Sequence, residues 1–157
     1  MEDRECIIDF IDEGWIRFRD VRKLVYEVLY RDFGVPEDGD WHQAADEDVQ
    51  VVALCGFKIA GTARLVGHSG DDRLQLRQVA VLPEFQGTGI GRLLVRELEQ
   101  WARESGAREV WLNARDNAFP FYERLGYQFT GETFISELTK IPHRSMRKSL
   151  ADSEHAE

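Results

Sequence analysis

The chain has 157 residues, of which 43% are hydrophobic and 31% charged, the size and composition of one globular domain. No apolar run approaches the roughly 18 residues that span a bilayer, so we expect no membrane partner. The net charge of −9 lies entirely in residues 1–48, where 15 acidic residues outnumber 6 basic ones. This balance argues against nucleic acid as a partner.

The chain has two cysteines, Cys6 and Cys55. Two thiols in a domain of this size predict a reducing, cytoplasmic setting without a disulfide framework. The acidic stretch 1–5 predicts that no signal peptide is present. No Cys/His cluster has zinc spacing, so we expect no metal.

The first half of the chain alternates strand and helix patterns. Apolar residues at three- and four-residue spacing predict a helix over 18–30. Residues 36–48 read as a loop with six acids and no base, and Trp41 and His42 lie in its middle. Strands are predicted at 6–11, 49–58, 59–67 and 73–82, with the middle two forming a hairpin. Pro83 ends the last strand because it has no N–H to continue a ladder.

The second half continues with an amphipathic helix from about residue 89 to 105, whose apolar face carries Ile90, Leu94, Leu98 and Trp101. A strand at 110–114 follows, and the strand, helix, strand order predicts a parallel pair with 73–82. A short helix then ends at Leu125. Two closing strands are predicted at 127–130 and from 134 to 146 or beyond. We expect one domain over 1–150 and a flexible C-terminal tail at 151–157.

A glycine-rich turn at Gln86-Gly87-Thr88-Gly89-Ile90-Gly91 joins the strand at 73–82 to the following helix. Glycines at this density let backbone N–H groups approach a bulky ligand, and the helix start attracts anions. These features predict a phosphate or pyrophosphate cradle. A Walker A loop is excluded because Arg92-Leu93 follows the last glycine. A Rossmann fingerprint is disfavoured because Arg92 stands where its third glycine belongs.

The turn resembles the Gln/Arg-x-x-Gly-x-Gly/Ala signature of the GNAT N-acetyltransferase superfamily. Val79-Ala80-Val81 precedes it as in that family, and a second block, Asn113-Ala114-Arg115-Asp116-Asn117 with Phe121-Tyr122 after it, is also similar. The resemblance is sharp over about 74–131 and extends over 5–150. It implies an α/β (α+β by some schemes) GNAT fold. That fold is a mixed, mostly antiparallel sheet of about six to seven strands, with about four helices and a splayed parallel strand pair.

The resemblance also implies acetyl-CoA as the co-substrate of an amine acetylation. Val81 would stabilise the oxyanion through its backbone N–H, and Tyr122 would be the general acid. The general base has three alternatives: Glu84 just after the central strand, His143 in a Pro-His-x-x-Met pattern that resembles one found in a subset of the family, or a chain of water molecules. The implied acetyl-CoA contacts come from Val79, Ala80, Val81, Gln86, Gly87, Thr88, Gly89, Ile90, Gly91, Arg92, Asn117 and Tyr122.

The acceptor is not encoded in a motif. Because the acidic region around Trp41 and His42 corresponds to the part that shapes the acceptor site in the family, we hypothesise a cationic acceptor, such as a polyamine, an amino sugar or a peptide amine. A homodimer is an expectation because dimers are common in the family. An acyl-CoA-binding sensor without turnover is the alternative function, and a nucleotide-dependent enzyme is disfavoured by the failed Walker and Rossmann matches.

Overall fold

A computed structural model describes residues 5–42 and 48–150. The predicted tail at 151–157 lies outside the described residues. The helices are α1 (Phe18–Val25), α2 (Ile90–Glu104) and α3 (Phe119–Arg124), with a π-helical turn η1 (Tyr26–Tyr30) and short 3-10 turns η2 (Arg31–Phe33), η3 (Asp40–His42), η4 (Pro83–Phe85) and η5 (Asp116–Ala118). The strands are β1 (Cys6–Ile11), β2 (Val49–Cys55), β3 (Lys58–Val66), β4 (Arg73–Val81), β5 (Glu109–Arg115), β6 (Gln128–Phe129), β7 (Phe134–Ile135) and β8 (Pro142–Ser149).

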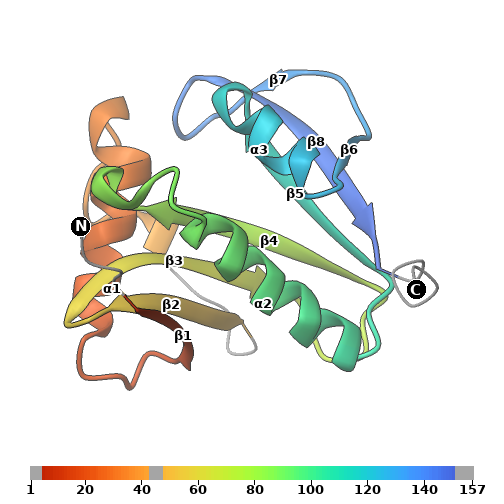
Figure 1. The fold of residues 1–157 in the computed structure, drawn as a ribbon. Helices are drawn as coiled ribbons and strands as arrows, with labels where there is room; N and C mark the ends of the chain where they lie inside the picture. The colour runs from red at the N-terminus through yellow and green to blue at the C-terminus, as the bar shows by residue number, and fades with distance from the viewer. Residues whose placement is uncertain (1–4, 43–47, 151–157) are drawn as a thin grey trace.

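The described strands form one mixed sheet in the order β1-β2-β3-β4-β5-β8-β6, and β7 pairs with β8. The pair β4 and β5 is parallel and the other pairs are antiparallel. Pairing between β4 and β5 covers only Arg73–Gln75 with Glu109–Trp111, after which the two strands diverge (Figure 1). The predicted mixed sheet with a splayed parallel pair is therefore confirmed.

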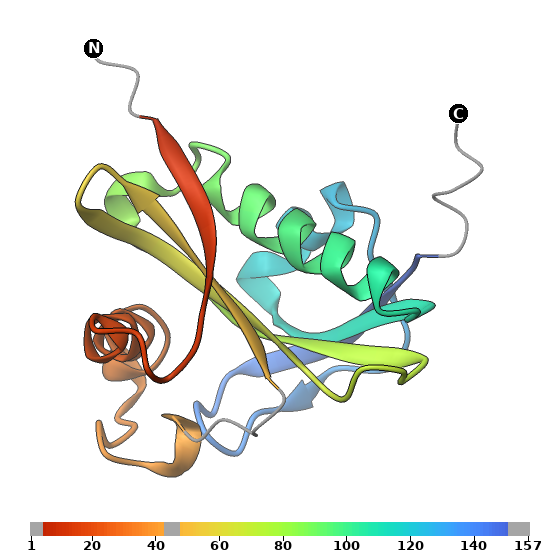
Figure 2. The same cartoon turned by 90° about the horizontal axis from the view of Figure 1, so that it is seen from below.

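Helices cover both faces of the sheet. Figure 2 shows α1 end-on against one face, while α2 and α3 lie on the other. The main core lies under α2, where Leu94, Val95 and Leu98 pack with the buried residues of β3, β4 and β5. The predicted apolar stripe of this helix is thus its buried face. Within the described part of the chain, no helix is long and apolar enough to cross a bilayer.

The sequence-based boundaries were wrong in two places. The closing strand predicted from 134 to 146 is split into β7 and β8 by a turn, where Lys140 has a left-handed φ of 64° and the Ser136 hydroxyl accepts the N–H groups of Leu138 and Thr139. This split accounts for the eighth strand. The helix predicted at 18–30 becomes a π-helical turn after Val25.

The cysteine prediction was also wrong. Cys6 and Cys55 form a disulfide, because the antiparallel register of β1 and β2 places these two residues directly opposite each other. Cys6 and Cys55 are 49 residues apart in the chain, so sequence spacing gives no sign of the pairing. The disulfide joins the edge strand to its neighbour and removes the argument for a reducing compartment.

Candidate functional site

A cavity of about 860 Å³ opens where β4 and β5 diverge. Its walls come from these two strands, the glycine turn, the first turns of α2, the helix α3 and strand β8, with η1 closing one side. The divergence of two parallel strands leaves backbone groups without a ladder partner, so this is a place where an extended ligand can bind.

The glycine turn forms one end of this cavity. Gly87 and Gly89 have left-handed φ values of 79° and 92°, which a residue with a Cβ rarely adopts. Gly89 also ends the turn as the residue before α2, so the first N–H groups of the helix face the cavity end without intrahelical partners. Three cationic side chains line the cavity here, Arg92 and Arg96 from α2 and Arg124 from α3. This end suits a pyrophosphate group.

The end of β4 directs its polar backbone groups into the gap. The N–H of Leu82 donates to the carbonyl of Ala60 in β3 at 2.9 Å. Because alternate residues of a strand point their N–H and C=O groups to opposite sides, Val79 and Val81 direct theirs away from β3 and towards the gap. The Val81 carbonyl there accepts the side-chain amide of Gln86 at 2.9 Å.

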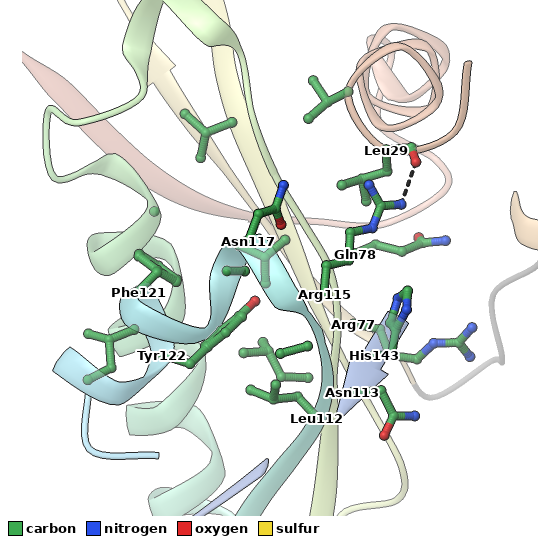
Figure 3. A pocket seen from close by; sticks show the side chains of 18 of the residues that line it. Leu29, Arg77, Gln78, Leu112, Asn113, Arg115, Asn117, Phe121, Tyr122 and His143 are labelled. Atoms are coloured by element: carbon green, nitrogen blue, oxygen red, sulfur yellow. Dashed lines mark hydrogen bonds between the residues drawn. The ribbon is translucent and has the colours of Figure 1, made fainter. Parts of the chain in front are cut away.

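Tyr122 lies between the two ends of the cavity. Its ring packs against Phe121 and Tyr127 at 4.9 and 5.7 Å between centroids, and only 8% of the residue is exposed. Figure 3 shows its hydroxyl directed into the cavity. Burial raises the pKa of Tyr122 above its ordinary value near 10, and the positive charge of Arg115 partly offsets this effect. The phenol is therefore protonated at neutral pH.

Most residues expected to contact acetyl-CoA line this cavity, namely Val79, Val81, Gln86, Gly87, Gly89, Gly91, Arg92, Asn117 and Tyr122. The side chains of Ala80 and Ile90 are buried in the core, so only their backbone can contribute. The Thr88 hydroxyl donates to the carbonyl of Phe85, which stabilises the turn itself.

The two residues among the alternative bases lie in different surroundings. His143 lines the cavity, and its Nδ1 lies 3.1 Å from the carbonyl of Ile141. A hydrogen bond from Nδ1 leaves Nε2 as the acceptor, the tautomer that a base requires. Glu84 does not line the cavity and instead forms an exposed ion pair with Lys58 at 3.0 Å. Of these two residues, His143 is the one that lines the cavity.

Apart from His143, the other end of the cavity holds residues to which the sequence assigned no role. Arg115 and His143 are directly opposite each other in β5 and β8, so both side chains are on the same face of the sheet. Strand alternation from the pair Gln75 and Trp111 puts Arg77 on this face too. Leu76, Leu112 and Ala114 point to the opposite face, into the core under α2. Figure 3 shows Arg77, Gln78, Arg115 and His143 across Tyr122 from Phe121.

Gln78 and Arg115 are held firmly at this end. Gln78 has a φ of 52°, uncommon for a residue with a side chain, and its amide donates to the hydroxyl of Tyr30 at 3.1 Å and the carbonyl of Trp41 at 2.7 Å. Arg115 donates from Nη2 to the carbonyl of Leu29 in η1. Gln78 could not be found from the sequence, because a positive φ at a residue other than glycine cannot be recognised from sequence. Arg115 lies in the block Asn113–Asn117 that resembles the family, but no function was assigned to it.

Within residues 5–42 and 48–150, no group of three or more His, Cys, Asp or Glu side chains is arranged to hold a metal ion.

Comparison with known proteins agrees with this architecture. The family model described as "Acetyltransferase (GNAT) family" matches residues 12–127, about three quarters of the chain. The chain belongs to the GNAT acetyltransferase family. The family match therefore confirms the resemblance carried by the glycine turn and by the block around Tyr122.

Individual relatives agree with the family. An uncharacterised N-acetyltransferase, YjcF of Bacillus subtilis, is 30% identical over 122 residues, which are 78% of this chain and 85% of the relative. The streptothricin acetyltransferase of Streptomyces lavendulae is 35% identical over 98 residues, 60% of this chain, but the chain spans only 52% of that protein. An aminoglycoside 6'-N-acetyltransferase solved with coenzyme A has the same fold, with a TM-score of 0.77 and 18% identity, over 92% of this chain and 97% of that one.

Proposed function

We propose that this GNAT protein is an acetyl-CoA-dependent N-acetyltransferase that acts on a primary amine of a small molecule or peptide. The observation that carries the proposal is the gap between β4 and β5, which has the glycine turn at one end and the hydroxyl of Tyr122 directed into it. The relatives named above include a streptothricin acetyltransferase and an aminoglycoside 6'-N-acetyltransferase, and the proposal extends that reaction class to this chain.

The residues at the two ends of the cavity fit coenzyme A in different ways. The left-handed glycines, the start of α2 and Arg92 are proposed to bind the pyrophosphate. The outward-facing backbone of Val79 and Val81 is proposed to bind the extended pantetheine arm as an added strand would, with Asn117 contacting the same arm. Bound acetyl-CoA supplies the activated thioester.

In the reaction the amine nitrogen forms a bond to the acetyl carbon, and the bond from that carbon to sulfur breaks. The N–H of Val81 is proposed to donate to the carbonyl oxygen as it gains negative charge. Tyr122 donates its proton, or a hydrogen bond, to the departing sulfur. His143 accepts the proton that the amine must lose, through Nε2. The cationic side chains around the cavity favour the neutral form of the amine, which is the form that attacks.

The test is release of the coenzyme A thiol over a panel of amines, with acetyl-CoA binding measured by calorimetry in parallel. We expect saturable thiol release with at least one amine, together with the matching N-acetylated product by mass spectrometry. Binding of acetyl-CoA without thiol release from any amine would instead indicate a non-catalytic acyl-CoA-binding module.

A further inference from the structure

Among the described residues, the aspartate, glutamate, lysine and arginine side chains that line the cavity are all arginines. The described lining of the cavity includes Arg77, Arg92, Arg96, Arg115 and Arg124, and no aspartate or glutamate among the described residues lines it. The acidic stretch that motivated a cationic acceptor contributes nothing to these walls from its described part, since Glu37, Asp38, Asp40 and Asp48 do not line the cavity. Asp46 and Glu47 lie outside the described residues.

The five arginines divide into two groups. Arg92, Arg96 and Arg124 come from α2 and α3, on the side of the glycine turn where phosphates are expected. Arg77 and Arg115 come from β4 and β5 and lie on the face that α1 covers, across Tyr122 from Phe121 (Figure 3). Coenzyme A at the glycine-turn end would leave this second end, where Arg115 lies directly opposite His143, for the acceptor.

Arg115 is held in place by contacts with neutral protein groups. Its Nη2 donates to the carbonyl of Leu29, and its guanidinium lies 4.9 Å from the ring centroid of Phe33. These contacts fix the plane of the guanidinium group and use one of its five N–H donors. Within the described part of the chain, neither Arg115 nor Arg77 forms an ion pair.

Arg64, a nearby arginine with a structural role, provides a comparison for Arg115. Arg64 in β3 is buried, and Nη1 lies 2.6 Å from the carboxylate of Asp48. A cation that is taken out of water normally has such a partner, because desolvation without one is costly. Arg115 is half-buried, and burial lowers its pKa, yet its contacts among the described residues are a neutral carbonyl and aromatic rings.

We propose that the acceptor carries a carboxylate in addition to its amine, and that Arg115 binds this carboxylate with help from Arg77. The inference rests on the proposed acetyl transfer and names its substrate class as an amino carboxylic acid. A planar guanidinium that is already fixed in orientation matches a carboxylate through two parallel hydrogen bonds. Such binding would also align the amine with His143, which lies directly across the β5–β8 ladder from Arg115.

The test uses the full chain, acetyl-CoA and matched acceptors that differ only in the acidic group. Each set holds an amino acid, its carboxamide, its decarboxylated amine and the corresponding aminophosphonate. Because a hydrogen bond to a charged group contributes about 1.5–3 kcal/mol, we expect the acid to exceed its amide and decarboxylated amine in kcat/KM by about 10- to 100-fold. Preference for the decarboxylated amines would overturn the inference, and preference for the aminophosphonate would replace the carboxylate by a phosphate-like group.

Variants locate the effect. Arg115→Gln should lower kcat/KM for the acid far more than for the decarboxylated amine, so that the preference for the acid is lost, mainly through KM. Arg77→Gln, at an exposed position, keeps the test available if the Arg115 variant does not fold. Arg19 is an exposed arginine of α1 outside the cavity, so Arg19→Gln is the matched control. This control should change kcat/KM neither for the acid nor for the decarboxylated amine. A preference for the acid that survives both cavity variants would refute the assignment.

Calorimetry separates this inference from the proposed function. The acid and its decarboxylated partner are titrated into the protein saturated with coenzyme A, so that no chemistry is needed. If no amine releases thiol, the acetyltransferase proposal fails, and the binding preference alone then decides the inference. Equal affinity for acid and amine in this assay would overturn the inference even if acetylation occurs.

Discussion

Replacing Tyr122 by phenylalanine removes one oxygen from the centre of the cavity and little else. The ring contacts with Phe121 and Tyr127 remain, and the hydroxyl forms no hydrogen bond with a described residue. Its loss therefore leaves no buried group unsatisfied, so the free energy of unfolding should hardly change. The proposed role in catalysis predicts a fall in kcat of about 100-fold, which corresponds to about 2.7 kcal/mol of transition-state stabilisation.

The assay is thiol release at saturating amine, with the acetyl-CoA dissociation constant measured by calorimetry on the same preparation. The affinity should hold, because the proposed contacts of the glycine turn and of Val79 and Val81 are intact. Tyr26→Phe is the matched control. That hydroxyl donates to the carbonyl of Val35 at 2.8 Å outside the cavity, so this variant should lose about 1 kcal/mol of stability and keep its kcat.

The pH dependence sharpens the same prediction. Because burial raises the pKa of Tyr122, its hydroxyl stays protonated as pH rises through 8 and 9. The pH profiles of the wild-type and phenylalanine-variant rates should therefore have the same shape in this range, with no additional alkaline decline in the wild type. A kcat within about twofold of wild type in Tyr122→Phe would refute the catalytic reasoning. An alkaline decline near pH 8.5 that disappears in the variant would refute the burial argument.

Three further predictions test the turn, the disulfide and the core. Gly89→Ala forces a residue with a Cβ to a φ of 92°, so acetyl-CoA affinity should fall at least about tenfold while far-UV circular dichroism is retained. Cys6→Ser opens the loop closed by the bond to Cys55, and the 49-residue separation predicts a loss of about 4 kcal/mol in chemical unfolding; an unchanged midpoint under reducing and oxidising conditions would argue against the bond. Burial and Glu99, which accepts a hydrogen bond from the Tyr127 hydroxyl at 2.8 Å, raise the pKa of Tyr127. The protonated Tyr127 hydroxyl therefore makes its full contribution to the free energy of unfolding below the unfolded-state pKa near 10. Above that pH the contribution declines by about 1.4 kcal/mol per pH unit. Tyr127→Phe should flatten the dependence of the free energy of unfolding on pH from 10 to 11.5.

The glycine-turn end of the site was accessible from the sequence because its determinants are local. A strand that stops at Pro83, glycines that adopt left-handed backbone and a helix that begins at once all lie within one stretch of chain. Each of these features depends on the residue itself and its immediate neighbours. The same reasoning applies to the apolar stripe of α2, whose 3.6-residue period is set by the helix alone.

The hairpin of β2 and β3 and the parallel pair of β4 and β5 could also be inferred, whereas the pairing and bounds of the edge strands could not. The bond between Cys6 and Cys55 depends on the register of two strands that are distant in the chain. The split of the last strand depends on the left-handed backbone conformation of Lys140, which the conformational preferences of lysine do not predict.

The sequence by itself determined the family, the sheet and the end of the cavity that suits a pyrophosphate. Tertiary structure alone decided the other end, because its residues come from η1, β4, β5 and β8 and meet only when the sheet is assembled. The net charge illustrates the difference. The chain is acidic, with the excess in its first third, yet the folded cavity is lined by arginines. Composition averages over the whole surface, whereas a ligand meets only the side chains that the fold directs into one cavity.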